Sequence, residues 1–269
     1  MFAGKFRFMQ FVDTHTHLYQ PDFKDDIENV IHGAMQAGVE KFLLPNIDRD
    51  SIAPMLNLVS NYPGKCFPMM GLHPTSVKED YKNELAFIEN ELINNTDKFI
   101  GVGEIGIDLY WDKTFLDNQI NAFEYQINLA KKLHLPIVIH ARESFDEIFD
   151  VLNITNDDKL RGVFHSFSGT SEQAGKAMSY GFYLGVGGIV TFKNGGLDKI
   201  LNDIPLERII LETDSPYLSP APKRGKRNES ANIRIIAERI AQIKNIPVQH
   251  VASVTTSNAN KLFNLEKHG

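Results

Sequence analysis

The chain has 269 residues, of which 42% are hydrophobic and 23% are charged, proportions that exclude a disordered or fibrous protein. The formal net charge of −6 excludes a protein that coats duplex nucleic acid, because such proteins are usually basic. Any nucleic-acid contact must therefore be local. No stretch approaches ~18 consecutive apolar residues, so we expect no membrane span. The single cysteine, Cys66, excludes an internal disulfide, predicts a cytoplasmic protein and is expected to lie in the core.

Eight short apolar runs recur along the chain, with helix-like segments between them. Their apolar stretches are continuous rather than alternating, which is typical of parallel strands buried on both faces. The expected strands cover 11–18, 41–47, 66–74, 99–108, 135–141, 161–168, 182–188 and 208–215.

The segments between these runs have the apolar spacing of amphipathic helices, clearest in 22–37, 115–133 and 229–244. Strand and helix repeated eight times predict an α/β fold, a (β/α)8 TIM barrel, with a doubly wound open sheet as the alternative. We expect one domain over residues 11–264, which includes an extra C-terminal helix that begins near Pro247. Residues 1–10 are expected to be an N-terminal extension, and 265–269 a tail.

Histidines and carboxylates gather where the expected strands end, the edge at which a barrel of this kind carries its active site. Five of the nine histidines lie there, and the fourth and eighth strands each end in two carboxylates. A carboxylate at the end of an apolar run is costly to bury without a partner. The residues concerned are His15, His17, His73, His140, His165, Glu104, Asp108, Glu212 and Asp214.

The His15-Thr16-His17 segment places two imidazoles on one side of a strand, because side chains alternate along it. With Glu104, His140, His165 and Asp214 on other strand ends, six ligands are available. Six are too many for one tetrahedral ion and suit a metal pair that shares a carboxylate. Two ions ~3.5–4 Å apart can activate water and stabilise both the attacking and the leaving oxygen of an in-line displacement.

Six motifs in a fixed order carry a family resemblance. They are DTHTHL (13–18), GLHP (71–74), GEIGID (103–108), IHARES (139–144), FHSFSG (164–169) and ETDSPYLSPAPKRGKRNES (212–230). Together they resemble the TatD family of metal-dependent hydrolases and deoxyribonucleases, within the amidohydrolase-like barrels. The resemblance covers residues 11–264.

This resemblance implies a role for each candidate ligand. His15 and His17 would bind one metal together with Asp214, His140 and His165 would bind the other, and Glu104 would bridge both. Asp214 can also take the proton from the attacking water. The resemblance implies Mg²⁺, whereas a histidine-rich ligand set suits Zn²⁺, Mn²⁺ or Fe²⁺.

Three positions depart from the family pattern. Tyr19 stands where an acidic residue is common, Ser166 where a cysteine is frequent, and Ser230 where a proline is frequent. None of them is an expected ligand, so the departures bear on substrate preference.

Further residues are candidates for contacts around the metals. His73 is expected to contact a phosphate or leaving group, and Arg142 to hold a phosphate or to pair with Glu143. Glu212 is expected to orient a histidine. The glycines of 185–188 are expected to give backbone room at the mouth of the seventh strand. Four cations of the loop after the eighth strand predict a local phosphate-binding patch, with Arg224 and Lys226 as its main contacts; they are Lys223, Arg224, Lys226 and Arg227.

These observations predict a two-metal phosphodiesterase that acts on DNA, as a 3′→5′ exodeoxyribonuclease on single strands. The alternative, which the family resemblance also implies, is a metal-dependent ester hydrolase such as a D-aminoacyl-tRNA deacylase. A third possibility is a metal-bearing barrel that mainly binds a partner, and the complete ligand set argues against it. The expected partner is single-stranded DNA or another nucleic-acid substrate, with no obligate protein partner.

Overall fold

A computed structural model of the chain describes residues 9–267 and contains eight parallel strands. Residues 1–8 of the expected N-terminal extension lie outside the described residues. The strands are β1 (Phe11–Asp13), β2 (Val39–Pro45), β3 (Cys66–Met69), β4 (Val102–Asp108), β5 (Ile137–Arg142), β6 (Gly162–Phe164), β7 (Tyr183–Val186) and β8 (Ile209–Leu211).

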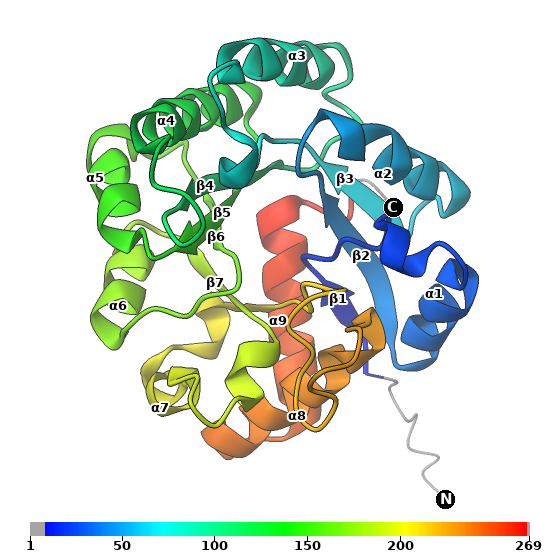
Figure 1. The fold of residues 1–269 in the computed structure, drawn as a ribbon. Helices are drawn as coiled ribbons and strands as arrows, with labels where there is room; N and C mark the ends of the chain where they lie inside the picture. Colours follow the sequence, from blue (N-terminus) through cyan, green and yellow to red (C-terminus); the bar gives the residue numbers. More distant parts are fainter. Residues whose placement is uncertain (1–8, 268–269) are drawn as a thin grey trace, which may run out of the picture.

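Helices follow the strands and surround them, as the view along the barrel in Figure 1 shows. The alternation confirms the predicted (β/α)8 barrel. The helices of the described residues are α1 (Ile27–Gln36), α2 (Arg49–Asn61), α3 (Tyr81–Asn94), α4 (Leu116–Leu133), α5 (Phe145–Thr155), α6 (Ser171–Ser179), α7 (Leu197–Ile200), α8 (Ile233–Lys244) and α9 (Val248–Phe263).

Two seams close the barrel. Strands β1, β2 and β3 form one parallel sheet, and β4 to β8 form the other. A parallel bridge between Met70 and Val102 joins β3 to β4. The amide of Thr14 donates to the carbonyl of Leu211 at 3.1 Å and so joins β1 to β8. The strands therefore follow chain order around a closed ring, which excludes the open sheet.

The extra C-terminal helix closes one end of this ring. Helix α9, red in Figure 1, lies across the middle of the barrel. Its Leu262 and Phe263 pack in one buried cluster with Val12, Leu43 and other residues of the strands. Leu265, the first residue of the expected tail, is also fully buried in this cluster. With one end filled by α9, the opposite end remains for a site.

Several strands are shorter than the expected segments: β3 ends at Met69 rather than at residue 74, β6 at Phe164 rather than at 168, and β8 at Leu211 rather than at 215. Two further differences have a visible local cause. Strand β1 ends at Asp13 rather than near residue 18. The following amides bond to the two neighbouring strands alternately, since the Thr14 amide donates to the carbonyl of Leu211 on β8 and the Thr16 amide to that of Leu43 on β2. Helix α1 begins at Ile27 rather than at residue 22, because a 3₁₀ turn over Pro21–Phe23 precedes it. Proline fits the first turn of a helix, where its missing N–H has no partner.

No helix among residues 9–267 is both long and apolar enough to cross a membrane. Cys66 is buried at the start of β3, as expected for a core residue. Burial raises the pKa of its thiol to about 12, so it is inert as a nucleophile near neutral pH.

Candidate metal centre

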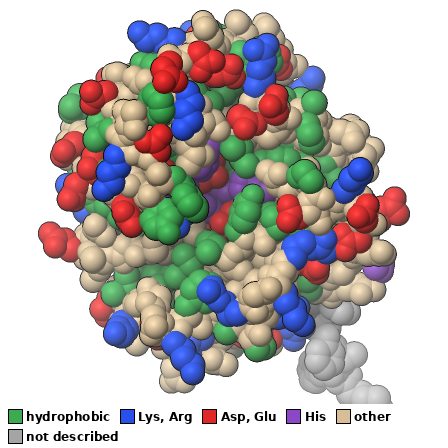
Figure 2. All heavy atoms as spheres, in the orientation of Figure 1, with side chains coloured by type: hydrophobic (Ala, Val, Ile, Leu, Met, Phe, Trp, Pro, Cys, Tyr) green, Lys and Arg blue, Asp and Glu red, His purple; other side chains and the backbone are tan. Residues whose placement is uncertain are grey.

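A pocket of about 570 Å³ opens at the carboxyl ends of the strands, a volume within the range of small-molecule sites. Figure 2 shows histidine and acidic side chains at the floor of a hollow on this face, with hydrophobic side chains around it. The pocket is lined by His17, His73, Glu104, Asp108, His140, Arg142, His165 and Asp214, and by the apolar or aromatic Ile47, Trp111, Ile189, Tyr217 and Leu218.

Glu104, on β4, lies at the centre of the site, and its two oxygens face different histidines. Oε2 lies 3.2 Å from Nε2 of His15 and 3.8 Å from Nε2 of His17. Oε1 lies 2.8 Å from Nδ1 of His140 and 3.6 Å from Nε2 of His165. One carboxylate therefore joins the histidines that follow β1 to the histidine of β5 and the one that follows β6.

Asp214 approaches the same cluster from the loop after β8. Its Oδ1 lies 3.5 Å from Nε2 of His17 and 3.8 Å from Nε2 of His15. Its backbone has a φ of 56°, in the left-handed region, a conformation that aspartate tolerates better than most residues and that is common at functional sites. Its side chain is 13% exposed, against 3% for Glu104, so Asp214 is the more open carboxylate.

The donor set fits divalent metal ions. Three groups of side chains have their ligand atoms within 4.8 Å of one another. Imidazole nitrogens and carboxylate oxygens are the ligands of Zn²⁺, Mn²⁺ and Fe²⁺ sites. The groups are His15 with His17 and Glu104, His15 with His165 and Asp214, and His73 with Glu104 and His140.

His165 was expected to bind the same metal as His140, but it lies closer to His15. Its ring stacks on that of His15, with centroids 3.5 Å apart, whereas the centroid of His140 is 6.5 Å away. Its Nδ1 lies 3.0 Å from Oε1 of Glu212, in line with the expectation that Glu212 orients a histidine. A side chain at Gly185 would place its Cβ 2.3 Å from Glu212 Oε2, so the expected backbone room is used by this carboxylate.

Asp108 orients His140, a role that the sequence-based reasoning did not assign. Its Oδ2 lies 2.7 Å from Nε2 of His140. An imidazole that donates one N–H to a carboxylate presents its other nitrogen to a metal. The signal was available in the sequence, because Glu104 and Asp108 lie four residues apart in one strand and so share a face.

Tyr19 plays a comparable part for His17. Its hydroxyl donates to the carbonyl of Pro45 and lies 2.9 Å from Nδ1 of His17. Since the hydroxyl proton is used by Pro45, the tyrosine oxygen accepts from Nδ1–H of His17. The lone pair of His17 is then on Nε2, the atom that faces Glu104 and Asp214. The tyrosine at the position where the family commonly has an acidic residue therefore still fixes the histidine tautomer.

The charges of this largely buried cluster balance one another. Burial raises the pKa of Glu104, but the surrounding histidines outweigh it and hold that pKa well below its ordinary value. Burial lowers the pKa of His165, whereas the carboxylates of Glu212 and Glu104 raise it to about 10. Burial, together with the neighbouring His165, lowers the pKa of His15 and keeps it neutral, the form that binds a metal.

His73 lies next to the cluster. Its Nδ1 accepts from the amide of Thr75 at 3.2 Å, so the proton of the neutral ring is on Nε2. That nitrogen lies 3.4 Å from Glu104 Oε1. His73 in this tautomer offers the pocket a donor rather than a lone pair.

Arg142 contacts two aromatic rings and makes no ion pair with Glu143 among the described residues. Its guanidinium carbon lies 3.8 Å from the centre of the Tyr110 ring and 5.4 Å from that of Trp111. The residue lines the pocket, so its charge is available there.

The four cations of the basic loop after β8 differ in their contacts. Arg227 pairs with Asp26 at 2.6 Å and with Glu229 at 3.0 Å, and Lys223 donates to Asn232. Arg224 lies over the ring of Phe192 at 3.7 Å. Within residues 9–267 the Lys226 side chain has no ion pair or hydrogen bond. None of the four lines the pocket. Lys223 and Arg227, two cations of the expected patch, are therefore engaged in structural bonds.

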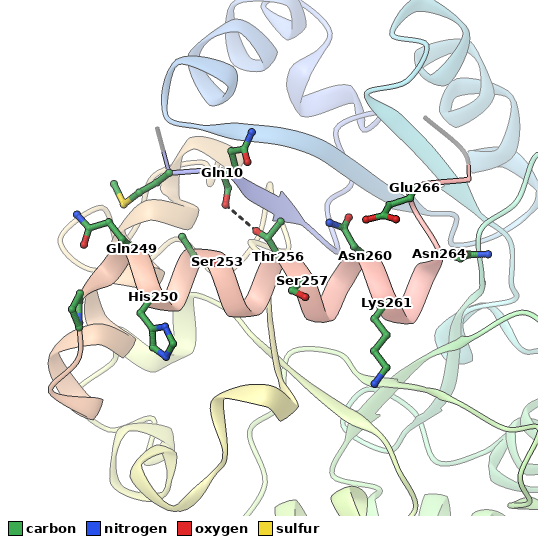
Figure 3. A pocket seen from close by; sticks show the side chains of 13 residues that line it. Gln10, Gln249, His250, Ser253, Thr256, Ser257, Asn260, Lys261, Asn264 and Glu266 are labelled. Carbon is green, nitrogen blue, oxygen red and sulfur yellow. Dashed lines mark hydrogen bonds between the residues drawn. The ribbon is translucent and has the colours of Figure 1, made fainter. Parts of the chain in front are cut away.

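A larger hollow of about 900 Å³ lies along the outer face of α9. Figure 3 shows that its labelled side chains are mainly amides and hydroxyls, such as Gln249, Ser253 and Asn260. Its only histidine is His250, and the metal-binding groups of the described residues all lie elsewhere. This hollow is therefore not the candidate metal centre.

Comparisons with known proteins agree with this arrangement. A family model described as TatD related DNase matches residues 12–264. YabD of Bacillus subtilis, an uncharacterized metal-dependent hydrolase, is 36% identical over 254 residues, which cover 94% of this chain and 98% of that protein. YcfH of Escherichia coli K12, described in the same words, is 32% identical over 265 residues, with 96% and 97% covered. The crystal structure of YjjV, a TatD homologue of Escherichia coli K12, superposes with a TM-score of 0.90 at 29% identity and covers 96% of this chain and 99% of that one.

A (β/α)8 barrel with histidines and carboxylates at the carboxyl ends of its strands defines the class of metal-dependent hydrolases. The chain belongs to the TatD family within that class. The family resemblance expected from the six motifs is confirmed, and the protein is a metal-dependent hydrolase.

Proposed function

We propose that the protein is a cytoplasmic phosphodiesterase that uses two divalent metal ions to hydrolyse DNA, as a 3′→5′ exonuclease on single strands. The family to which the chain belongs is described as TatD related DNase, which favours DNA among the possible esters. A pocket at the mouth of a barrel suits the end of a strand better than a long duplex.

The position of Glu104 is the observation that carries the two-metal proposal. Its two oxygens face separate histidines, with Nε2 of His15 at 3.2 Å from one and Nδ1 of His140 at 2.8 Å from the other. Glu104 would bridge the ions, and the outer ligands would be His15, His17, Asp214, His140 and His165. Two such ions supply charge to the phosphate and activate water.

Asp214 would accept the proton of the attacking water at its carboxylate. Its side chain is the more exposed of the two ligand carboxylates. The nearby histidines, His17 foremost, outweigh its burial and lower its pKa, so it is ionised and able to accept a proton near neutral pH. On the substrate side, Nε2–H of His73 and the guanidinium of Arg142 would contact phosphate oxygens, and Arg224 and Lys226 would attract the remaining strand.

A substrate panel tests this proposal. The purified protein, with its metal content measured, is offered 5′-labelled single-stranded DNA, duplex DNA, RNA and D-aminoacyl-tRNA, each with Mg²⁺, Mn²⁺ or Zn²⁺. We expect two metal ions per chain and stepwise shortening of single-stranded DNA from its 3′ end. A metal-free protein that gains no activity on addition of metal contradicts the proposal. Ester cleavage of D-aminoacyl-tRNA without nuclease activity selects the alternative function.

Two variants exclude a contaminating nuclease. Glu104→Gln and Asp214→Asn keep the size of each side chain but remove its charge. We expect Asp214→Asn to lower the nuclease rate by about 10²- to 10⁴-fold, the usual contribution of a positioned base, and Glu104→Gln to lower it comparably because it removes the carboxylate charge that would hold both ions. Ile154→Ala, at a side chain that is 83% exposed on α5, is the matched control and should retain the rate of the unaltered protein.

A further inference from the structure

Two aromatic side chains stand exposed beside the candidate metal centre. Tyr110 and Trp111, in the loop after β4, are 50% and 70% exposed. Trp111 lines the same pocket as His140 and Asp214. Adjacent aromatic side chains that are open to solvent at the rim of a functional pocket mark a surface for a ligand.

Arg142 adds a positive charge to this pair. The rings of Tyr110 and Trp111 meet edge to face, with centroids 4.9 Å apart. The guanidinium of Arg142 lies over Tyr110 at 3.8 Å and at a longer 5.4 Å over Trp111, and the indole of Trp111 is the more exposed of the two rings. We call Tyr110, Trp111 and Arg142 the aromatic shelf.

Asp108 fixes the aromatic shelf relative to the proposed metal ligands. Its Oδ1 accepts from the amides of Tyr110 and Trp111 at 3.0 Å and 3.3 Å. Its Oδ2 lies 2.7 Å from Nε2 of His140. One buried carboxylate thus holds both the loop that carries the shelf and a histidine of the centre.

We propose that the aromatic shelf stacks the nucleobase next to the phosphate that is cleaved, with the indole of Trp111 as the stacking face. This inference rests on the proposed function and specifies its substrate. A base inside a duplex has both faces covered by its neighbours, so only an unpaired base or a strand end can use the shelf. Stacking tolerates any base, because every base has a π-face. The shelf therefore selects unpaired ends with little preference for sequence.

Fluorescence provides a direct test, because Trp111 is the only tryptophan of the chain. The metal-loaded protein is titrated with a hexathymidylate whose phosphorothioate linkages resist cleavage. A matched oligomer carries tetrahydrofuran in place of each nucleoside, so it has the backbone without bases. We expect hexathymidylate to quench the tryptophan emission and the abasic oligomer to leave it unchanged. Equal quenching by both, or none by either, overturns the inference.

Variants measure how much the indole contributes. Removal of a stacking side chain lowers affinity by about 5- to 150-fold per base, so we expect a decrease of this size for Trp111→Ala in the fluorescence anisotropy of labelled hexathymidylate. Trp111→Phe should recover most of it, because it retains an aromatic face. The control Ile154→Ala should bind as the unaltered protein does. Binding by Trp111→Ala that equals the control overturns the inference.

Hydrolysis separates this inference from the proposed function. With cleavable phosphodiester linkages, we expect the unaltered protein to prefer hexathymidylate to the abasic oligomer, and Trp111→Ala to show much less of that preference. Equal rates on both oligomers, unchanged by Trp111→Ala, would overturn the shelf and leave the phosphodiesterase intact. Absence of hydrolysis with either oligomer, and with every divalent metal, would overturn the proposed function itself.

Discussion

Nε2 of His140 lies 2.7 Å from Oδ2 of Asp108, and Nδ1 of the same ring lies 2.8 Å from Oε1 of Glu104. Burial lowers the pKa of His140, but its bonds to Asp108 and Glu104 outweigh that effect and raise the pKa. The two carboxylates have different positions: Glu104 lies among the histidines at the centre, and Asp108 lies behind His140. Asp108 therefore determines which nitrogen of His140 faces the centre.

Asp108→Asn should weaken metal binding without unfolding the protein. The neutral amide supports the His140 ring less well, and removal of such a partner typically lowers metal affinity by about 10- to 100-fold. Isothermal titration with Mn²⁺ measures the affinity, and far-UV circular dichroism monitors the fold. Asp112→Asn in the same loop, whose side chain is 42% exposed, is the control. Equal Mn²⁺ affinities for both variants would show that Asp108 does not support the centre.

Tyr19→Phe should weaken the other side of the centre. The variant removes the oxygen that accepts from Nδ1 of His17, so the histidine no longer has the bond that fixes its tautomer. We expect about 10- to 100-fold weaker binding of one metal ion, and nitrogen chemical shifts that report a mixture of His17 tautomers. Tyr217→Phe is matched, because its ring lies 5.9 Å from that of His17. If the two variants bind metal alike, the Tyr19 hydroxyl has no positioning role.

Most of the fold was predictable because its signals are local. Continuous apolar runs are the mark of buried parallel strands, and the start of the extra helix at Pro247 was expected one residue before α9. The boundaries of β1 were not predictable, since the strand-like segment 14–17 pairs with β2 on one side and with the β8 end on the other. The pairing of Thr14 with Leu211 joins residues 197 positions apart.

The sequence predicts that the six expected ligands converge, because they lie at strand ends. It does not predict the hydrogen-bond partners of these ligands. The bond from His17 to Tyr19 depends on where the carbonyl of Pro45 lies, and no spacing rule gives that. Arg227 illustrates the opposite case. It reads as one more cation of a basic run, yet Asp26 and Glu229 already neutralise it. Side-chain partners across elements require the fold itself.

Asp13 should make stability depend on pH. Burial, with a contribution from the charge of Glu212, raises its pKa from 3.8 to about 7, although bonds from Ser230 and Thr213 act in the opposite direction. The protonated Asp13 carboxyl therefore makes its full contribution to the free energy of unfolding below pH 3.8, and this contribution is lost as pH rises through about 7. Over this range the free energy of unfolding falls by up to about 1.4 kcal/mol per pH unit because of this one group.

Asp13→Asn isolates this effect, since the amide does not titrate. Urea unfolding of both proteins, in buffer with a chelator, should show the variant gaining stability relative to the unaltered protein as pH rises from about 4 to about 8. Other titrating groups contribute equally to both curves and cancel in the difference. A difference that is constant over this range would mean that the Asp13 carboxyl titrates at its ordinary pKa.

Substitutions in the basic loop should show that its cations have two different roles, in DNA binding and in stability. Arg224 and Lys226 have no carboxylate partner among residues 9–267, so Arg224→Ala with Lys226→Ala should weaken binding of single-stranded DNA. The slope of log affinity against log salt should fall by about 0.7 for each phosphate that the variant no longer neutralises. Arg227→Ala should instead lower the melting temperature and leave that slope unchanged, because Arg227 is bound to Asp26 and Glu229. Salt titrations of DNA binding and thermal melts of both variants test this division. A slope that changes with Arg227→Ala and not with the double variant would reverse the assignment.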